Sequence, residues 1–471
     1  MAMLGEDILY LSVGELARRI EARTITPVAL TESYLARAEK LGPKLNAFAT
    51  LTPDLALEQA HAAERQIKAG RYRGPLHGIP YAAKDLLAVE KYPTTWGARP
   101  FAKQAFNYNA TVIENLNRAG AVLLGKAAMI ELAGGMGYRF ASASATGAAK
   151  NPWKTDCWTC GSSSGSGAIV AAALAAWAIG TETWGSIVCP SSFCGVTGLR
   201  PTFGRVSRHG AMALSYSLDK IGPMARTADD CGRILSVISG HDWKDTSTLP
   251  LDRASFAYSA AQDLRAGPLR VGWAVNAWKD MEAGVAKAVK EAMNVLRKHV
   301  ASLKETELPQ GPWDETAGIM IGAEGASAYE ELITSGRAAE LTDPLGQIAG
   351  YVNQQISASD YLHAQRVRGV LQRKMTGLFD DFDVLAGAAE PITATPLELN
   401  LETELTFSDP IGAIGNLCGL PAISVPCGFN EKGLPVGLLF VARAGNDLAV
   451  VRAARSFQQY TSWHKKRPNI H

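Results

Sequence analysis

The sequence lacks the excess of one charge that is typical of nucleic-acid-binding proteins. Of its 471 residues, 47 are Lys or Arg and 45 are Asp or Glu, so the net charge is +2. Hydrophobic residues make up 47% and charged residues 20%, which is ordinary for a globular enzyme with a large core. We therefore expect no nucleic-acid partner.

Long hydrophobic runs are also missing. The longest apolar segment, residues 168–179, is about a dozen residues long, too short to span a bilayer and more typical of a buried helix. The first twenty residues lack a basic segment followed by an apolar run, so we expect no signal peptide. These features predict a cytoplasmic protein without membrane association.

Cysteine and histidine are scarce and scattered. The seven cysteines are an odd number, and we expect them to be reduced thiols. Cys157 and Cys160 form a CxxC motif, but no second pair completes a zinc site, so the motif is interpreted as structural or incidental. The eight histidines include no HExxH motif. We expect neither a metal nor an organic cofactor.

Helical patterns alternate with short apolar segments along the chain, which is typical of an α/β sheet covered by helices. No internal repeat or low-complexity linker interrupts them, so we expect a single domain over residues 1–471. The expected helices lie within residues 12–20, 26–35, 55–68, 110–120, 284–300 and 361–379, and the expected strands within 121–124, 269–273, 384–385 and 422–425.

Two turns rich in small residues, at 161–165 and 180–186, dominate the most informative part of the sequence. Glycines at such turns allow backbone N–H groups to converge on one point, as an oxyanion hole requires. Residues 161–165 also match the G-x-S-x-G nucleophile elbow, which would make Ser163 the nucleophile. That elbow needs a buried strand before it, and residues 151–156 are polar and loop-like.

The chain resembles the amidase signature family over nearly its whole length. The motifs that carry the resemblance are GIP at 78–80 before Lys84, Gly125-Lys126, NPW at 151–153, the serine- and glycine-rich segment 160–202, and GLPAISVP at 419–426. The resemblance implies a twisted mixed β-sheet covered by helices on both faces. It also suggests a homodimer, although the sequence alone does not settle the oligomeric state.

The resemblance further implies three catalytic residues. Ser186, at the end of the turn GTETWGS, is the implied nucleophile, and Ser162, 24 residues earlier, is a bridging serine after a cis peptide bond. Lys84 is the implied base. The implied oxyanion hole consists of the backbone N–H groups of Thr183, Trp184, Gly185 and Ser186.

This chemistry sets a physical demand on Lys84. A serine hydroxyl needs a base to take its proton, and a lysine is a base only when burial lowers its pKa enough to leave it neutral. The apolar neighbours Ala82, Ala83, Leu86 and Leu87 suit that demand. Asp85 would oppose it, so we expect its side chain to point away.

Four positions depart from the common family pattern. Trp184 and Ser164 replace glycines, Glu182 replaces an aspartate, and Val188 stands where arginine is usual. We expect the Trp184 indole to lie against the pocket wall or in the core. The departures resemble a branch with a GTETWGSIV-type turn and leave the relay residues in place.

The predicted function is hydrolysis of the C–N bond of a small, apolar or aryl amide. By position in the family, the expected substrate-binding residues are Met129, Gly135, Met136 and Ile414, together with Trp184. A carbamate (urethane) or ester hydrolase with the same three residues is the first alternative. A catalytically silent scaffold is disfavoured because the three residues are intact.

The second alternative is the glutaminase subunit of a tRNA-dependent amidotransferase. Asp409 precedes Asn416 by seven residues, as in that subgroup. Residues 322–357, however, contain no match to the subgroup's Arg-Phe-Asp-Gly-type segment, where glutamine would be held. A dedicated protein partner is therefore the less favoured interpretation.

Overall fold

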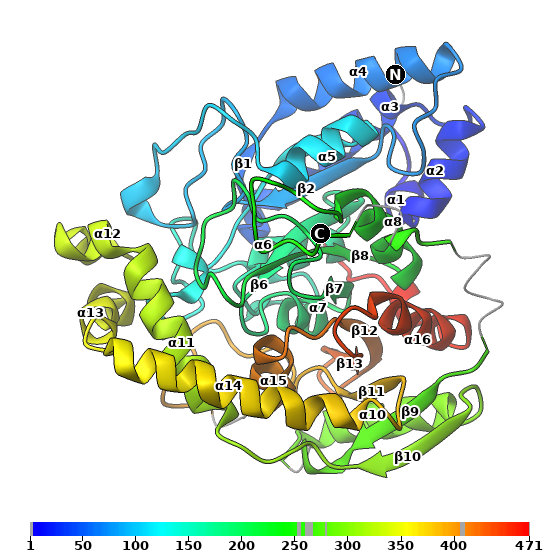
Figure 1. Cartoon of the computed structure of the whole chain (residues 1–471). Coiled ribbons are helices and arrows are strands. Elements are labelled where there is room, and N and C mark those ends of the chain that lie inside the picture. Colours follow the sequence, from blue (N-terminus) through cyan, green and yellow to red (C-terminus); the bar gives the residue numbers. More distant parts are fainter. Residues whose placement is uncertain (1–2, 252–255, 260–266, 278–279, 406–409, 471) are drawn as a thin grey trace.

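The structure is a computed structural model that describes residues 3–251, 256–259, 267–277, 280–405 and 410–470 (Figure 1). Within these residues, eleven strands form one mixed sheet, and a hairpin of two short strands lies apart from it. The spatial order of the sheet is β1 (Phe48–Leu51), β3 (Val122–Ala127), β2 (Pro80–Lys84), β6 (Trp177–Glu182), β8 (Lys220–Ala225), β7 (Thr197–Arg200), β12 (Ala422–Phe429), β13 (Pro435–Val441), β11 (Val384–Ala388), β9 (Arg270–Ala274) and β10 (Ser302–Thr306).

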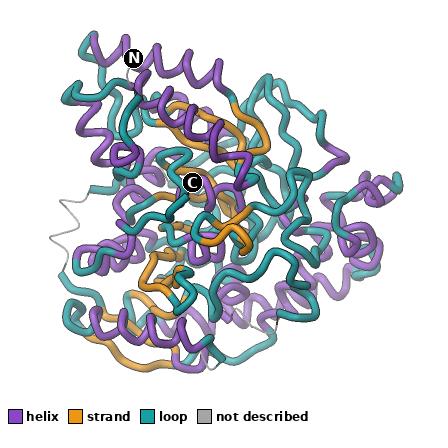
Figure 2. Tube along the Cα trace, turned by 180° about the vertical axis from the view of Figure 1, so that it is seen from behind, coloured by secondary structure: helices purple, strands orange, loops and turns teal. Residues whose placement is uncertain are grey.

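Helices cover both faces of this sheet, as expected, and Figure 2 shows the same arrangement from behind. None of the described helices is both long and apolar enough to cross a membrane. The α-helices are α1 (Glu6–Leu9), α2 (Val13–Glu21), α3 (Pro27–Leu45), α4 (Pro53–Lys68), α5 (Thr111–Ala119), α6 (Ser164–Ala171), α7 (Val188–Cys194), α8 (Ala228–Ile238), α10 (Ala283–Leu296), α11 (Trp313–Ala328), α12 (Glu330–Thr334), α13 (Pro344–Asn353), α14 (Ala358–Leu378), α15 (Pro410–Leu417) and α16 (Asp447–Gln459).

Capping residues explain where the first helices begin. Ser12 accepts a hydrogen bond from the Glu15 N–H, and the Glu15 carboxylate accepts one from the Ser12 N–H, which together form a capping box at the start of α2. Thr26 caps α3, and Pro27 occupies its first turn, where its missing N–H costs nothing. Both starts agree with the sequence prediction.

The prediction of one buried helix over 168–179 is wrong. Helix α6 ends at Ala171, and Trp177–Glu182 form strand β6 in the interior of the sheet. Every residue of β6 is buried, and the Trp177 ring stacks on Tyr81 of β2 with ring centroids 4.6 Å apart. A strand buried on both faces is continuously apolar, so periodicity cannot distinguish it from a buried helix.

Residues 151–156, expected to be a loop, contribute instead to a hairpin of β4 (Lys150–Asn151) and β5 (Lys154–Trp158). The exposed side chains of the first three residues of β5 explain why the segment resembles a polar loop in sequence.

The sheet places the two halves of the candidate site at one edge. Strands β2 and β6 are parallel neighbours, so their carboxyl ends, at Lys84 and Glu182, lie at the same edge. In open α/β sheets, ligands bind at such edges. The turn that carries Ser186 leaves β6 there and leads into α7.

Candidate active site

Lys84 is the last residue of β2, and its side chain is completely buried. Its Nζ lies 2.7 Å from Ser162 Oγ, 3.0 Å from Ser163 Oγ and 2.9 Å from Thr181 Oγ1. Burial lowers the pKa of Lys84 from 10.5 to about 7, although the more distant carboxylates of Asp219 and Glu182 oppose the shift. A substantial fraction of this amine is therefore neutral near pH 7.

Asp85 points away from Lys84, as expected. Its Oδ1 pairs with Lys126 Nζ at 2.9 Å on the neighbouring strand β3, and its Oδ2 accepts hydrogen bonds from the N–H and the hydroxyl of Thr95. Alternation along a strand places consecutive side chains on opposite faces. The adjacent carboxylate is thereby kept from stabilising the ammonium form of Lys84.

Ser162 follows a cis peptide bond from Gly161, as the resemblance implies. Its backbone carbonyl accepts a hydrogen bond from the Ile130 N–H at 3.2 Å. The next residue, Ser163, donates its N–H to the Ser186 carbonyl at 3.4 Å, which brings the serine-rich loop against the Ser186 turn. The structure thus places Lys84, Ser162 and the Ser186 turn in one cluster.

The Glu182 side chain stabilises the turn that carries Ser186. One carboxylate oxygen, Oε2, accepts the N–H groups of Ile187 at 2.9 Å and Val188 at 3.0 Å, at the start of α7. The other, Oε1, accepts hydrogen bonds from Arg200 at 2.6 Å and from the Asn416 amide at 3.1 Å. Although burial acts in the opposite direction, the Arg200 guanidinium lowers the pKa of Glu182 to about 2.

The position where the resemblance leads one to expect an arginine is occupied by Val188, and the cation that contacts Glu182 comes from another strand. Val188 is the first residue of α7 and is buried, and the positive charge beneath the turn comes from Arg200 on β7. The longer Glu182 side chain reaches both the helix start and Arg200.

The backbone of the turn leaves several donors free. In the described part of the chain, no hydrogen bond uses the N–H groups of Trp184, Gly185 or Ser186, or the Ser186 hydroxyl. Gly185 has a φ of +77°, a conformation that favours glycine. Three adjacent unused N–H groups beside a serine hydroxyl suit stabilisation of an oxyanion.

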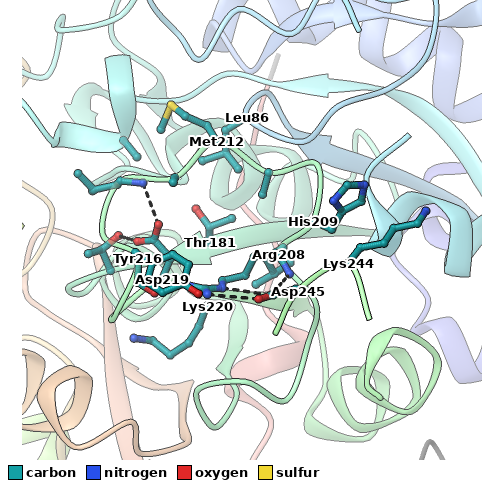
Figure 3. Close-up of a pocket in the computed structure, with 16 residues that line it drawn as sticks. Leu86, Thr181, Arg208, His209, Met212, Tyr216, Asp219, Lys220, Lys244 and Asp245 are labelled. Carbon is teal, nitrogen blue, oxygen red and sulfur yellow. Dashed lines mark hydrogen bonds and ion pairs between the residues drawn. The ribbon is translucent and has the colours of Figure 1, made fainter. Parts of the chain in front are cut away.

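Thr183 and Asp219 tie the turn to the loop before β8. The Thr183 hydroxyl donates to Asp219 at 2.5 Å, and the same carboxylate accepts the N–H groups of Leu214 and Ser215. Figure 3 shows Asp219 beside Lys220 in a cavity of about 210 Å³ that also contains the Arg208–Asp245 ion pair. Ser186 is not among the described residues that line this cavity.

Ser186 lines a different cavity, of about 340 Å³, which shares Ala133, Thr183 and Leu214 as lining residues with the cavity of Figure 3. Residues 129–136 reach its wall through Ala133 and Gly134. The remaining wall carries aromatic, aliphatic and acidic side chains. They include Trp184, Tyr138, Ile321 and Glu390. The Trp184 indole is half-buried on this wall, which agrees with the expectation for its position.

The four expected substrate-binding residues lie elsewhere. Met129, Met136 and Ile414 are buried in the core, and neither they nor Gly135 line the described wall of the Ser186 cavity. Packing explains the difference, because a side chain at Gly135 would lie 2.1 Å from Leu214 Cδ1. Leu214 itself lines the cavity, next to this segment. The assignment of these four residues to substrate binding stays a prediction.

A disulfide joins Cys160 to Cys189, so the expectation that all seven cysteines are reduced is wrong. Both residues line the Ser186 cavity, Cys160 two residues before Ser162 and Cys189 in α7. Cys157, the other member of the CxxC motif, is a buried free thiol. The CxxC motif did not predict this pairing, because Cys160 bonds to Cys189, 29 residues later, and not to Cys157. No metal-binding cluster occurs among the residues placed in the structure.

Comparison with known proteins places this geometry in context. The sequence model of the Amidase family matches residues 29–451. The chain belongs to the amidase signature family. Members of this family act on amides, and the described site has the hydroxyls, buried amine and free N–H groups that such chemistry requires.

Relatives match this amidase signature chain over nearly its whole length. It is 37% identical to a glutamyl-tRNA(Gln) amidotransferase subunit of Chloroflexus aurantiacus, over 98% of this chain and 99% of the relative. The peptide amidase of Stenotrophomonas maltophilia is 30% identical, covers 97% of this chain and 98% of its own, and superposes with a TM-score of 0.84. A chain from a vestigial protein complex related to an s-triazine catabolic enzyme is 27% identical, covers 98% and 100%, and has a TM-score of 0.87.

Sequence reasoning missed three contributors to the site. Thr181 and Ser163 contact the Lys84 amine, and Glu390 lines the Ser186 cavity. Assigning residues 177–182 to a strand would have revealed Thr181, because it lies near the end of β6 beside β2. Glu390 lies far along the chain, 204 residues after Ser186, and carries no local signal.

Proposed function

We propose that this protein hydrolyses amides through an acyl-enzyme on Ser186, with Lys84 as the base and Ser162 as the proton relay. The observation that carries the proposal is the environment of Lys84: a fully buried amine, 2.7 Å from Ser162, with a pKa lowered to about 7. A base with its pKa near the working pH is the most effective.

The reaction would proceed in two halves. As Ser186 Oγ attacks the carbonyl carbon, its proton passes to Ser162, whose own proton passes to neutral Lys84. The N–H groups of Thr183, Trp184, Gly185 and Ser186 would stabilise the oxyanion. The proton returns to the departing nitrogen, which leaves as ammonia or an amine. Water then uses the same relay to release the acid.

The substrate that we propose is a small amide with an apolar or aryl part. Trp184, Leu214 and Ile321 supply apolar surface on the wall of the Ser186 cavity. A carbamate or an ester could follow the same acyl-enzyme route, because the attack and the relay are identical.

The glutaminase subunit of an amidotransferase is the second candidate, and the names of the relatives favour it over the small apolar or aryl amide. Of the two residues whose spacing matches that subgroup, Asn416 donates its amide to Glu182, and Asp409 lies outside the described residues. One feature of the site argues against this candidate. No arginine or lysine occurs among the described residues of the Ser186 cavity, where the α-carboxylate of glutamine would need a partner.

A panel of primary amides, anilides, carbamates and glutamine tests these proposals by release of ammonia or amine. Ser186→Ala and Lys84→Ala should each abolish turnover, and mass spectrometry of a slow substrate should find the acyl group on the peptide that contains Ser186. Ser163→Ala is the matched control, because Ser163 also contacts Lys84 but does not line the cavity. An acyl group on Ser163 would overturn the assignment. Turnover of glutamine alone would establish the second candidate.

A further inference from the structure

A cavity of about 450 Å³ lies beside α2 and α8, which are neighbours in Figure 1. Its lining residues come from the N-terminal segment 10–18, from residues 226–233 and from the C-terminal segment 464–467. The second of these segments begins directly after β8, whereas Lys220, at the other end of β8, pairs with the last residue of β6. Because β6 leads into the Ser186 turn, this cavity and the candidate active site lie at opposite ends of β8.

Positive side chains outnumber carboxylates on the described wall of this cavity. The cationic side chains are Arg18, Arg226, Arg233, Lys465 and Arg467, and the carboxylates are Glu15 and Asp229. Both carboxylates already have partners. Glu15 closes the capping box at Ser12. Asp229 pairs with Arg455 at 3.0 Å.

Four of the cations have no such partner. Arg233 pairs with Asp230 at 3.3 Å, but no ion pair within the described parts of the chain involves the other four. Like charges brought together without a counter-charge repel one another. The cavity wall therefore offers a positive charge that an anion from solution can neutralise.

Arg226 is the buried member of this group, only 7% exposed. Its Nη2 donates to the Val170 carbonyl at 2.6 Å, and its guanidinium lies over the Tyr10 ring, 4.3 Å from the centroid. Its Nε has no hydrogen-bond partner among the described residues. A buried donor without an acceptor costs free energy, so an acceptor that enters the cavity would be stabilised there.

Arg467 lies over the same Tyr10 ring, 4.7 Å from the centroid. Burial lowers the pKa of Arg226 to about 10, and the Arg467 charge adds to the shift, so both guanidinium groups stay charged at neutral pH. His464 adds a second buried atom without a partner among the described residues, its Nδ1. Burial lowers the pKa of His464 to about 4, so at pH 7 the ring is neutral and one of its nitrogens is a donor.

We propose that this cavity binds the phosphate group of a small anion, either inorganic phosphate or a phosphate monoester. A monoester phosphate carries nearly two negative charges at pH 7 and three strongly accepting oxygens, which suits several unpaired cations better than a single carboxylate does. The planar fork of arginine donors matches such oxygens. The inference goes beyond the proposed hydrolysis of amides and does not depend on it.

Calorimetry of the full chain with inorganic phosphate, glycerol 3-phosphate and acetate at constant ionic strength tests the inference. We expect saturable binding of phosphate compounds at one site with a Kd of about 1 mM or lower, and binding of acetate at least about tenfold weaker. Tighter binding of glycerol 3-phosphate would identify a monoester as the ligand, and equal or tighter binding of phosphate would identify the inorganic ion. The absence of saturable binding of either compound up to about 10 mM, or equal affinity for acetate, would overturn the inference.

Lys465→Gln and Lys466→Gln form a matched pair. The two lysines are consecutive and exposed, so each substitution removes one charge from the surface without disturbing the core, but only Lys465 belongs to the described lining of the cavity. Lys465→Gln should weaken phosphate binding by about threefold to tenfold and Lys466→Gln by less than about twofold. Equal weakening would show a diffuse attraction to the surface and would overturn the site.

Arg226→Gln should have a larger effect, about tenfold or more, because it removes a buried charge from the cavity wall. Circular dichroism checks that this variant is folded, and the lysine pair decides the question if it is not. Ser186→Ala should bind phosphate as tightly as the wild type, since Ser186 lies at the other end of β8. Loss of phosphate binding in Ser186→Ala would place the anion at the candidate active site and would refute the proposed cavity.

Discussion

Two buried lysines on neighbouring strands have opposite surroundings. Lys84 ends β2 and Lys126 lies in β3, one residue out of register, and neither side chain is exposed. Lys126 pairs with the Asp85 carboxylate at 2.9 Å, whereas Lys84 contacts the hydroxyls of Ser162, Ser163 and Thr181. Burial lowers the pKa of both amines, and only for Lys126 does a contacting carboxylate oppose it.

The difference suits the Lys126 amine to a structural ion pair and the Lys84 amine to the proposed role of a base. A carboxylate in contact stabilises the ammonium form and completes a buried ion pair. Hydroxyl groups accept from an ammonium and donate to a neutral amine, so they accompany Lys84 in both protonation states. Because the Asp85 side chain points toward Lys126, it stabilises the ammonium form of Lys126 and makes no contact with Lys84.

The strongest test of this comparison is Lys84→Met. The substitution keeps the volume and removes the amine, so we expect kcat to fall by about 10⁴-fold, a loss typical of an essential group in a proton relay. The free energy of unfolding at pH 7 should stay the same or rise, because replacing a buried cation with an apolar chain removes a desolvation cost. Activity assays and urea unfolding measure the two effects. A folded variant with more than a tenth of the wild-type activity would refute the assignment of Lys84 as the base.

Lys126→Met should have the opposite effect, with a large loss of stability and a small change in kcat. Asp85 would be left as a buried carboxylate without its cation, which typically costs about 3–5 kcal/mol of unfolding free energy. The kcat of the fraction that remains folded should be much closer to wild type than that of Lys84→Met. Urea unfolding monitored by tryptophan fluorescence measures the loss. The double variant Lys126→Met/Asp85→Leu is the control, and it should recover most of the stability because neither partner is left alone.

The pH dependence of Lys84 gives a third contrast. Turnover requires the neutral amine, so kcat/KM should rise about tenfold per pH unit up to about pH 7 and then level off. The unfolded chain keeps this proton up to about pH 10.5, whereas the folded chain releases it near 7, so unfolding takes up a proton between these values. Rising pH should therefore stabilise the wild type relative to Lys84→Met by about 1.4 kcal/mol per unit in that window. A constant difference between the two unfolding free energies from pH 7 to pH 10 would contradict the lowered pKa.

That Lys84 and the two serine-containing turns lie together could be expected from sequence, because the motifs that carry the family resemblance are short and consecutive. The segment 160–202 contains both serine loops, and Lys84 follows directly on the GIP motif. The helix starts at Ser12 and Thr26 were predictable for the same reason, since each capping residue lies next to the helix that it starts.

Long-range contacts explain what could not be predicted. Asn416 reaches Glu182 across 234 residues, and Cys189 pairs with Cys160 only because α7 folds back onto the serine-rich loop. Strand β6 was missed for a different reason: its burial on both faces removes the alternation that identifies a strand. The four expected pocket residues were transferred by position in the family, and their role in substrate binding stays a prediction.

The smallest effects come from one matched pair of hydroxyls, Thr181 beside Lys84 and Thr94 beside Lys126, each 2.9 Å from the amine. Thr181→Val removes an acceptor for the ammonium form, so the pKa of Lys84 should fall further and the acid limb of kcat/KM should move down by about half to one pH unit. Thr94→Val should leave that limb in place and cost about 1 kcal/mol of unfolding free energy, because the carboxylate of Asp85 still holds the charge on Lys126. Equal shifts of the acid limb in both variants would show that the two lysines do not differ in the way that their partners indicate.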